Sequence, residues 1–122
     1  MIKFDLSKKI AVITGGAQGF GLAITERFIQ SGAEVIIWDI DEKAAKKALE
    51  KINSSNLSYQ LVDVINYENI EKNLKLIESK HRKIDIFINN AGIAGMNTTL
   101  AEYPIEEWNK IINLNLNSVF YC

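Results

Sequence analysis

A cluster of glycines near the amino terminus is the part of the sequence best suited to hold a phosphate group. The segment Thr14-Gly15-Gly16-Ala17-Gln18-Gly19-Phe20-Gly21 lies between an apolar run and a segment with helical spacing. Glycines permit a tight turn close to a diphosphate, and the free amides at the start of the helix attract its charge. Three residues separate Gly15 from Gly19 and one separates Gly19 from Gly21, unlike the Gly-x-Gly-x-x-Gly pattern. The segment predicts a phosphate-binding loop; the alternative is an ordinary glycine-rich turn.

A second candidate, Asp39, lies 18 residues after Gly21 (39 minus 21), at the predicted end of the second strand. Doubly wound folds place an acid near this position to accept hydrogen bonds from the adenosine ribose. Its charge would repel a 2′-phosphate, the neighbouring Ile40 and Asp41 supply no arginine, and Gln18 is uncharged. We therefore expect NAD to be preferred over NADP. The alternative is a loop acid that caps the following helix.

The elements that must position these residues alternate between buried strands and amphipathic helices. Asp41 is expected to cap the second helix, and Gly32 is expected to end the first. The predicted strands are Lys9 to Thr14, Glu34 to Trp38, Leu57 to Val62 and Ile84 to Ile88. The predicted helices run from the glycine segment to Gly32, from Asp41 to about Ile52, from Tyr67 to Lys80, and from Ile105 onward after a loop over Asn89 to Pro104.

Such alternation predicts right-handed crossovers and a parallel sheet, because each strand is followed by a helix that must pack back on the sheet. The expected fold is α/β, a partial, doubly wound, Rossmann-like parallel sheet of four strands with helices on both faces. We expect one domain over residues 1–122, since this length supports a single core.

These residues together resemble the short-chain dehydrogenase/reductase family. Thr14-Gly15-x-x-x-Gly19-x-Gly21 is similar to the family's cofactor motif, and the resemblance extends from Asp5-Leu6 to Phe120. The resemblance implies that Asn89-Asn90-Ala91-Gly92 supports the central sheet and lies along the cofactor. It also implies that Asp63-Val64 lines the adenine pocket; without the family, Asp63 would be interpreted as a solvated strand end.

Asn115 is the one catalytic candidate in this sequence. The resemblance implies that it holds a water in the family's proton relay. Helical spacing places Asn115 on one face with Trp108 and Ile111, where a buried amide must find hydrogen-bond partners. The alternative is a structural asparagine that ties the helix to a loop.

The resemblance further implies a catalytic serine after a fifth strand, and a tyrosine and a lysine four residues apart on a later helix. Tyr103 does not match, because Glu107 lies four positions after it, and Tyr121 has no residue at that distance. We expect this chain to supply the cofactor site for hydride transfer between NAD and a small alcohol or carbonyl, and to be inactive alone. The alternative is a truncated, inactive NAD-binding module. Residues 93–103 are expected to line the near wall of the substrate pocket.

Composition favours a cytoplasmic protein without nucleic-acid or membrane partners. The formal net charge is -1, so no strong basic field would recruit a nucleic acid or an anionic membrane. Cys122 is the only cysteine, which argues against a disulfide framework or a cysteine-rich metal site, and we expect no metal. The family resemblance implies that the last helix packs against its copy in another subunit. The apolar stripe of this helix, which includes Trp108 and Phe120, agrees with such a homo-oligomer.

Overall fold

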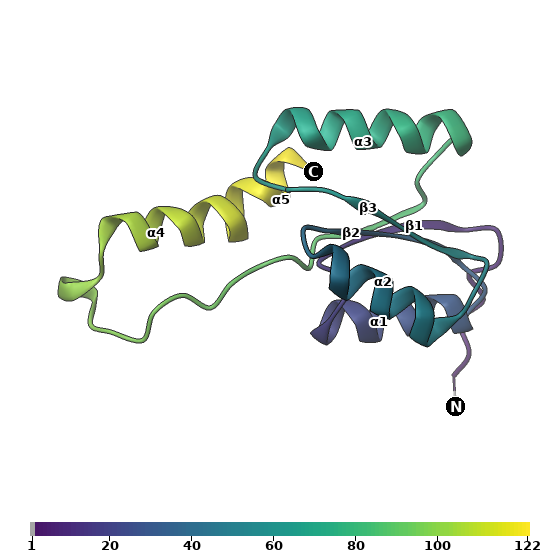
Figure 1. Cartoon of the computed structure of the whole chain (residues 1–122), viewed down its shortest axis with the longest axis horizontal. Coiled ribbons are helices and arrows are strands. Elements are labelled where there is room, and N and C mark those ends of the chain that lie inside the picture. Colours follow the sequence, from purple (N-terminus) through teal and green to yellow (C-terminus); the bar gives the residue numbers. More distant parts are fainter. Residues whose placement is uncertain (1) are drawn as a thin grey trace.

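The computed structural model describes residues 2–122, which form a parallel sheet of four strands between layers of helices (Figure 1). The order across the sheet is β3-β2-β1-β4, so the chain reverses direction across the sheet between β1 and β4. This order confirms the predicted doubly wound, Rossmann-like arrangement. The strands are β1, Ile10–Thr14; β2, Glu34–Asp39; β3, Leu57–Leu61; and β4, Ile86–Ile88.

The central strands β1 and β2 are buried on both faces, which explains their nearly continuous apolar sequences. Ile13 and Ile37 belong to the core on one face of the sheet. Val12, Ile36 and Trp38 belong to the core on the other face. The alternation of side chains along each strand therefore gives the sheet two separate apolar layers.

Three helices cover these two faces. α1, Gly19–Gln30, and α2, Glu42–Ile52, lie together on one side of the sheet, and α3, Tyr67–Lys80, lies on the other (Figure 1). The Asp41 carboxylate accepts a hydrogen bond from the Ala44 amide at 3.0 Å, as predicted for the cap of the second helix. Gly32 has φ of +92°, the left-handed conformation expected after the first helix. Local capping signals therefore set the helix boundaries.

The fourth strand is shorter than predicted and begins at Ile86 instead of Ile84. The Ile10 amide donates its hydrogen bond to Oδ2 of Asp85 at 2.9 Å. Because this amide bonds a side chain and not a backbone carbonyl of the neighbouring strand, regular pairing between β1 and β4 starts only after Asp85. The Lys83 ammonium lies 2.8 Å from the same carboxylate. The hydrogen bond from Lys83, followed by that from the Ile10 amide, lowers the pKa of Asp85.

The last part of the chain forms an arm that projects from the sheet (Figure 1). After β4 an extended loop leads to a 3₁₀ turn, η1, Leu100–Glu102, and then to α4, Ile105–Ile112. A π-helical turn, η2, Asn113–Asn117, joins α4 to α5, Ser118–Tyr121. The predicted final helix is therefore present, with a widened turn in its middle. Within residues 2–122 no helix is both long and apolar enough to cross a membrane.

Candidate functional site

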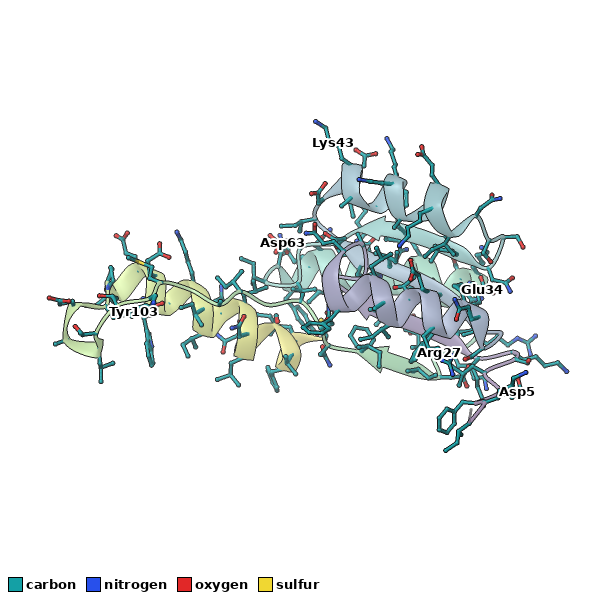
Figure 2. All side chains as sticks on the ribbon, turned by 90° about the horizontal axis from the view of Figure 1, so that it is seen from below. Asp5, Arg27, Glu34, Lys43, Asp63 and Tyr103 are labelled. Carbon is teal, nitrogen blue, oxygen red and sulfur yellow. The ribbon has the colours of Figure 1, made fainter. Side chains whose placement is uncertain are left out.

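A cleft lies at the carboxyl ends of the strands, where the strand order reverses. In open α/β sheets this switch point is where ligands bind. Figure 2 shows Asp63 on the side of the sheet nearest the arm and Glu34, at the start of β2, on the opposite side. The cleft has a volume of about 420 Å³ and is lined by Gly15, Gln18, Phe20, Trp38, Asp39, Ile40, Val62, Asp63, Val64, Asn90, Ala91, Gly92, Ile93 and Leu114.

Thr14 and Asn90 fix the base of the cleft by joining the ends of β1 and β4. The Thr14 hydroxyl oxygen accepts hydrogen bonds from the backbone amides of Asn90 at 2.9 Å and Ala91 at 3.0 Å. In return, Nδ2 of Asn90 donates to the carbonyl oxygens of Thr14 at 3.0 Å and Gly15 at 3.2 Å. These bonds hold the glycine turn against the segment after β4, so two regions about 75 residues apart form one rigid wall.

The glycine turn needs glycine for two different reasons. Gly15 and Gly19 have φ of +61° and +57°, in the left-handed region that favours glycine. A Cβ on Gly21 would collide with the Gly15 carbonyl oxygen and lie 2.6 Å from Nδ2 of Asn90. A Cβ on Gly19 would meet no atom within 4 Å, so open space lies on that side of the turn. A ligand can therefore approach the backbone of the turn from this side.

The start of α1 offers positive electrostatic potential to this space. Gln18 precedes the helix in an extended conformation, and its side chain makes no capping hydrogen bond. The first turn of α1 carries no acidic side chain to balance the helix dipole. Amides at such a helix start are suited to bind a phosphate. The residues present therefore fit the diphosphate of a dinucleotide.

Asp39, the last residue of β2, lines the cleft beside the glycine turn and is 8% exposed. Its Oδ2 accepts the Ala17 amide of the glycine turn at 3.2 Å, and its Oδ1 accepts the Asp41 amide at 3.0 Å. The side chain that caps α2 is that of Asp41, so Asp39 does not serve as the helix cap. Each carboxylate oxygen of Asp39 has a further lone pair available to a hydroxyl group. The geometry fits an acceptor for ribose hydroxyls.

Most of the other lining residues of the cleft are apolar. Val62 and Val64 are buried beside the exposed Asp63, whose Oδ1 accepts the Ile65 amide at 3.2 Å. Trp38 is 1% exposed and belongs to the core on this face of the sheet. An apolar wall with one carboxylate at its edge is suited to a flat ring that carries hydrogen-bond donors.

Asn115 lies in the π-helical turn and is exposed, so the expectation of a buried amide is wrong. Its Oδ1 accepts the Ile93 amide at 2.9 Å, and its Nδ2 donates to the Ile93 carbonyl oxygen at 2.8 Å. The helical face that contains Asn115 lies against the loop after β4: a Cβ on Gly92 would be 3.1 Å from Oδ1 of Asn115, and a Cβ on Gly95 would collide with Ile111. The side chain ties the helix to the loop after β4, as the structural alternative requires.

A family model described as short chain dehydrogenase matches residues 9–122. The chain belongs to the short-chain dehydrogenase family. It is 38% identical over 125 residues to the probable NADP-dependent mannitol dehydrogenase of Yarrowia lipolytica, covering 100% of this chain and 45% of that protein. It is 39% identical over 117 residues to the NAD-dependent glycerol dehydrogenase of Listeria innocua, covering 96% of this chain and 45% of that protein.

A solved structure shows the same fold. The crystal structure described as a short-chain dehydrogenase/reductase, glucose/ribitol dehydrogenase, from Brucella melitensis superposes with a TM-score of 0.91. It is 29% identical, and the match covers 98% of this chain and 51% of that chain. The present chain spans about half the length of the relatives it matches and corresponds to the amino-terminal, cofactor-binding part of the family. Nicotinamide dinucleotides are the typical cofactors of this family, and the relatives include both NAD and NADP enzymes.

The cleft brings together ten of the fourteen residues predicted to bind the cofactor: Gly15, Gln18, Phe20, Asp39, Ile40, Asp63, Val64, Asn90, Ala91 and Gly92. The other four predicted residues do not line the cleft. Thr14 and Gly21 stabilise the glycine turn on its protein side, and Gly19 borders the open side of the turn. Asn89 is exposed. The cofactor prediction omitted Trp38, Val62, Ile93 and Leu114, which also line the cleft. The sequence could have indicated Val62, since it directly precedes Asp63 at the end of a strand. No sequence pattern indicated Leu114, because only the tertiary fold brings the last helix to the cleft.

Proposed function

We propose that this chain is the NAD-binding part of an oxidoreductase that transfers hydride between NAD and a small alcohol or carbonyl compound. The observation that carries the proposal is the combination of the glycine turn, the uncapped start of α1 and Asp39 in one cleft. This combination suits the diphosphate and the adenosine ribose of a dinucleotide, with the phosphate site at the glycine turn and the hydroxyl acceptor at Asp39.

Electrostatics favour NAD over NADP. The residues that line the cleft include Asp39 and Asp63 and, within residues 2–122, no lysine or arginine. Asp41 and Glu42 lie two and three residues after Asp39, at the start of α2. A 2′-phosphate would add negative charge beside these carboxylates, where like charges repel. NAD carries a ribose hydroxyl there, which can donate a hydrogen bond to Asp39.

The proposed roles of the chain's residues are binding and orientation. NAD, when bound, supplies the hydride acceptor. The amides of the glycine turn and of α1 hold its diphosphate, Asp39 holds the adenosine ribose, and the wall containing Val64 receives the adenine. Asn90 orients the turn, and Asn115 fixes the loop that begins at Ile93 and faces the substrate. In this proposal Asn115 also holds the water of the proton relay, as the family resemblance implies.

Calorimetric titration of the chain with NAD and NADP, side by side, tests this proposal. We expect NAD to bind more tightly than NADP. Replacement of Asp39 by asparagine, which keeps one oxygen and removes the charge, is expected to shift the affinity ratio toward NADP by about tenfold. The exposed Asp5→Asn is a matched control and should leave the ratio unchanged. Tighter binding of NADP to the unmodified chain would refute the role of Asp39, and binding of neither dinucleotide would refute the proposal.

Catalysis is tested separately from binding. The sequence contains no tyrosine followed by a lysine four positions later, so we expect the 122-residue chain to bind NAD without oxidising alcohols. A panel of small secondary alcohols, with NADH formation as the readout, measures this. Turnover by this chain would contradict the assignment of binding and orientation alone.

A further inference from the structure

A chain of side-chain hydrogen bonds lies behind the apolar wall of the cleft. Nε1 of the Trp38 indole donates to Oε1 of Gln60 at 2.7 Å, and Nε2 of Gln60 donates to the Asn73 carbonyl oxygen at 3.3 Å. Nδ2 of Asn73 donates to the Asn69 carbonyl oxygen at 2.8 Å. The Asp63 amide donates to Oδ1 of Asn69 at 2.7 Å. The chain begins at Trp38 and ends at Asp63, which are both lining residues of the cleft.

Gln60 is the residue on which this network depends. It lies in β3 and does not line the cleft, but it connects β2 with α3. An indole N–H can only donate and a backbone carbonyl can only accept, so both contacts demand the same orientation of the Gln60 amide. A flipped amide would lose both hydrogen bonds at once. The orientation of Gln60 is therefore determined by its two partners.

Trp38 has little freedom while Gln60 holds it. Its ring meets Phe87 edge-on, with centroids 5.5 Å apart and an interplanar angle of 82°. Packing against Phe87 restrains the ring by shape, and the bond to Gln60 fixes its polar edge. Without an acceptor, the buried indole N–H would be left without a hydrogen bond. A rotation of the ring that exposes this N–H to water would then lower the free energy. The cleft is the adjacent open space.

We infer that Gln60 is a positioning residue for the dinucleotide site: it orients the indole of Trp38 and thereby shapes the wall that receives the adenine. This inference rests on the proposed function, because it assumes that the cleft binds NAD. It adds a residue outside the cleft to those that determine affinity. It also assigns the two ends of the network, Trp38 and Asp63, to the same subsite.

Two substitutions at Gln60 separate its contacts. Gln60→Met removes both hydrogen bonds and keeps the length of the side chain. Gln60→Glu keeps an acceptor for the indole but replaces the donor to α3 by a carboxylate oxygen, which repels the Asn73 carbonyl oxygen. We expect Gln60→Met to weaken NAD binding about threefold to tenfold in calorimetry, and Gln60→Glu, which still holds the indole, to weaken it less than Gln60→Met. Gln30→Met, at an exposed glutamine in α1, is the matched control and should have no effect.

Fluorescence reports the orientation of Trp38 directly. The chain has two tryptophans, so Trp108→Phe leaves Trp38 as the only indole emitter. In this background, Gln60→Met should make Trp38 emission more accessible to acrylamide, whereas Gln60→Glu should not. A residue that only stabilised β3 would change the unfolding temperature without this selective difference.

The outcomes distinguish the inference from the proposed function. If the unmodified chain does not bind NAD, the proposed function fails and the inference fails with it. If the chain binds NAD and Gln60→Met binds it equally well, or if both Gln60 variants weaken binding alike, the inference alone is overturned. Should Gln60→Met not fold, Trp38→Phe removes the N–H while keeping a ring; unchanged NAD affinity in that variant would also overturn the inference.

Discussion

At the scale of single residues, Gly19 and Gly21 belong to the same turn but meet different constraints. A side chain on Gly21 would enter the space held by Gly15 and Asn90 inside the protein. A side chain on Gly19 would point into the open space where the diphosphate is proposed to lie. Conformational strain applies to Gly19, where φ is +57°, and steric overlap applies to Gly21. Substitution of Gly21 should therefore affect mainly the stability of the fold, and substitution of Gly19 mainly the binding of the dinucleotide.

We predict that Gly21→Ala destabilises the fold by about 3 kcal/mol, because the turn cannot move away from Asn90 without breaking its hydrogen bonds. Gly19→Ala is expected to cost only about 1 to 2 kcal/mol of conformational strain and to reduce NAD affinity more strongly than stability. Urea denaturation measures the first quantity and calorimetry the second. Equal loss of stability in both variants would contradict this division.

The residues of the site could be predicted where local sequence determines them. The glycine turn, Asp39 and the segment after β4 each follow a strand directly, so their positions at one edge of a parallel sheet follow from strand alternation. Leu114 lies more than 20 residues after β4 on a projecting arm, and its place in the cleft depends on how that arm is oriented. The exposure of Asn115 could not be predicted either, since it depends on what covers the helix.

At the scale of elements, the π-helical turn in the last helix holds the loop after β4 through Asn115. Three asparagines at alternate positions, Asn113, Asn115 and Asn117, were the available signal, because asparagine is a poor helix former. Apolar periodicity alone predicts a regular helix here. The turn places the Asn115 amide against both backbone groups of Ile93. Helix and loop are thereby joined as one unit.

We predict that Asn115→Leu releases this loop. The Ile93 amide loses its acceptor, so its hydrogen exchange should accelerate by about tenfold, with smaller increases through the loop to Pro104. Asn109→Leu, at an exposed asparagine in α4, is the control and should leave the exchange of Ile93 unchanged. Figure 2 shows Tyr103 far out on the arm, where its Oη accepts the Met96 amide at 2.9 Å. Unchanged exchange at Ile93 would show that Tyr103 and packing hold the loop without Asn115.

The helices were predicted more accurately than the shortest strand. α2 and α3 begin after Asp41 and Asn66, whose side chains accept amides of the first turn, so the sequence carries its own boundary signals. β4 has no such signal at its start. Its first residues are apolar enough for a strand, but Asp85 competes for the Ile10 amide. The first residue of β4 is thus determined by one hydrogen bond between distant residues, which the local sequence pattern cannot predict.

At the scale of the whole molecule, the arm exposes apolar side chains that a folded protein rarely leaves in water. Large exposed residues along α4, η2 and α5 are Ile105, Trp108, Leu116, Val119 and Phe120. Phe120 is 87% exposed and therefore contributes little to the fold of one chain. An apolar surface of this kind is typical of protein–protein interfaces. It supports the proposal that copies of the chain associate through this helix.

We predict that the chain sediments as a dimer or larger species at micromolar concentration, and that Phe120→Glu shifts it to a monomer. A carboxylate at this position would have to lose its hydration to enter an apolar interface, whereas in the isolated chain it stays in water. Leu76→Glu is the control: Leu76 is also exposed, at 54%, but belongs to α3 and not to the helix of the arm. Sedimentation velocity distinguishes the species. Because Phe120 does not line the cleft, NAD affinity should be retained in the monomer. A monomeric unmodified chain would contradict the association, and equal dissociation by Leu76→Glu would place the interface elsewhere.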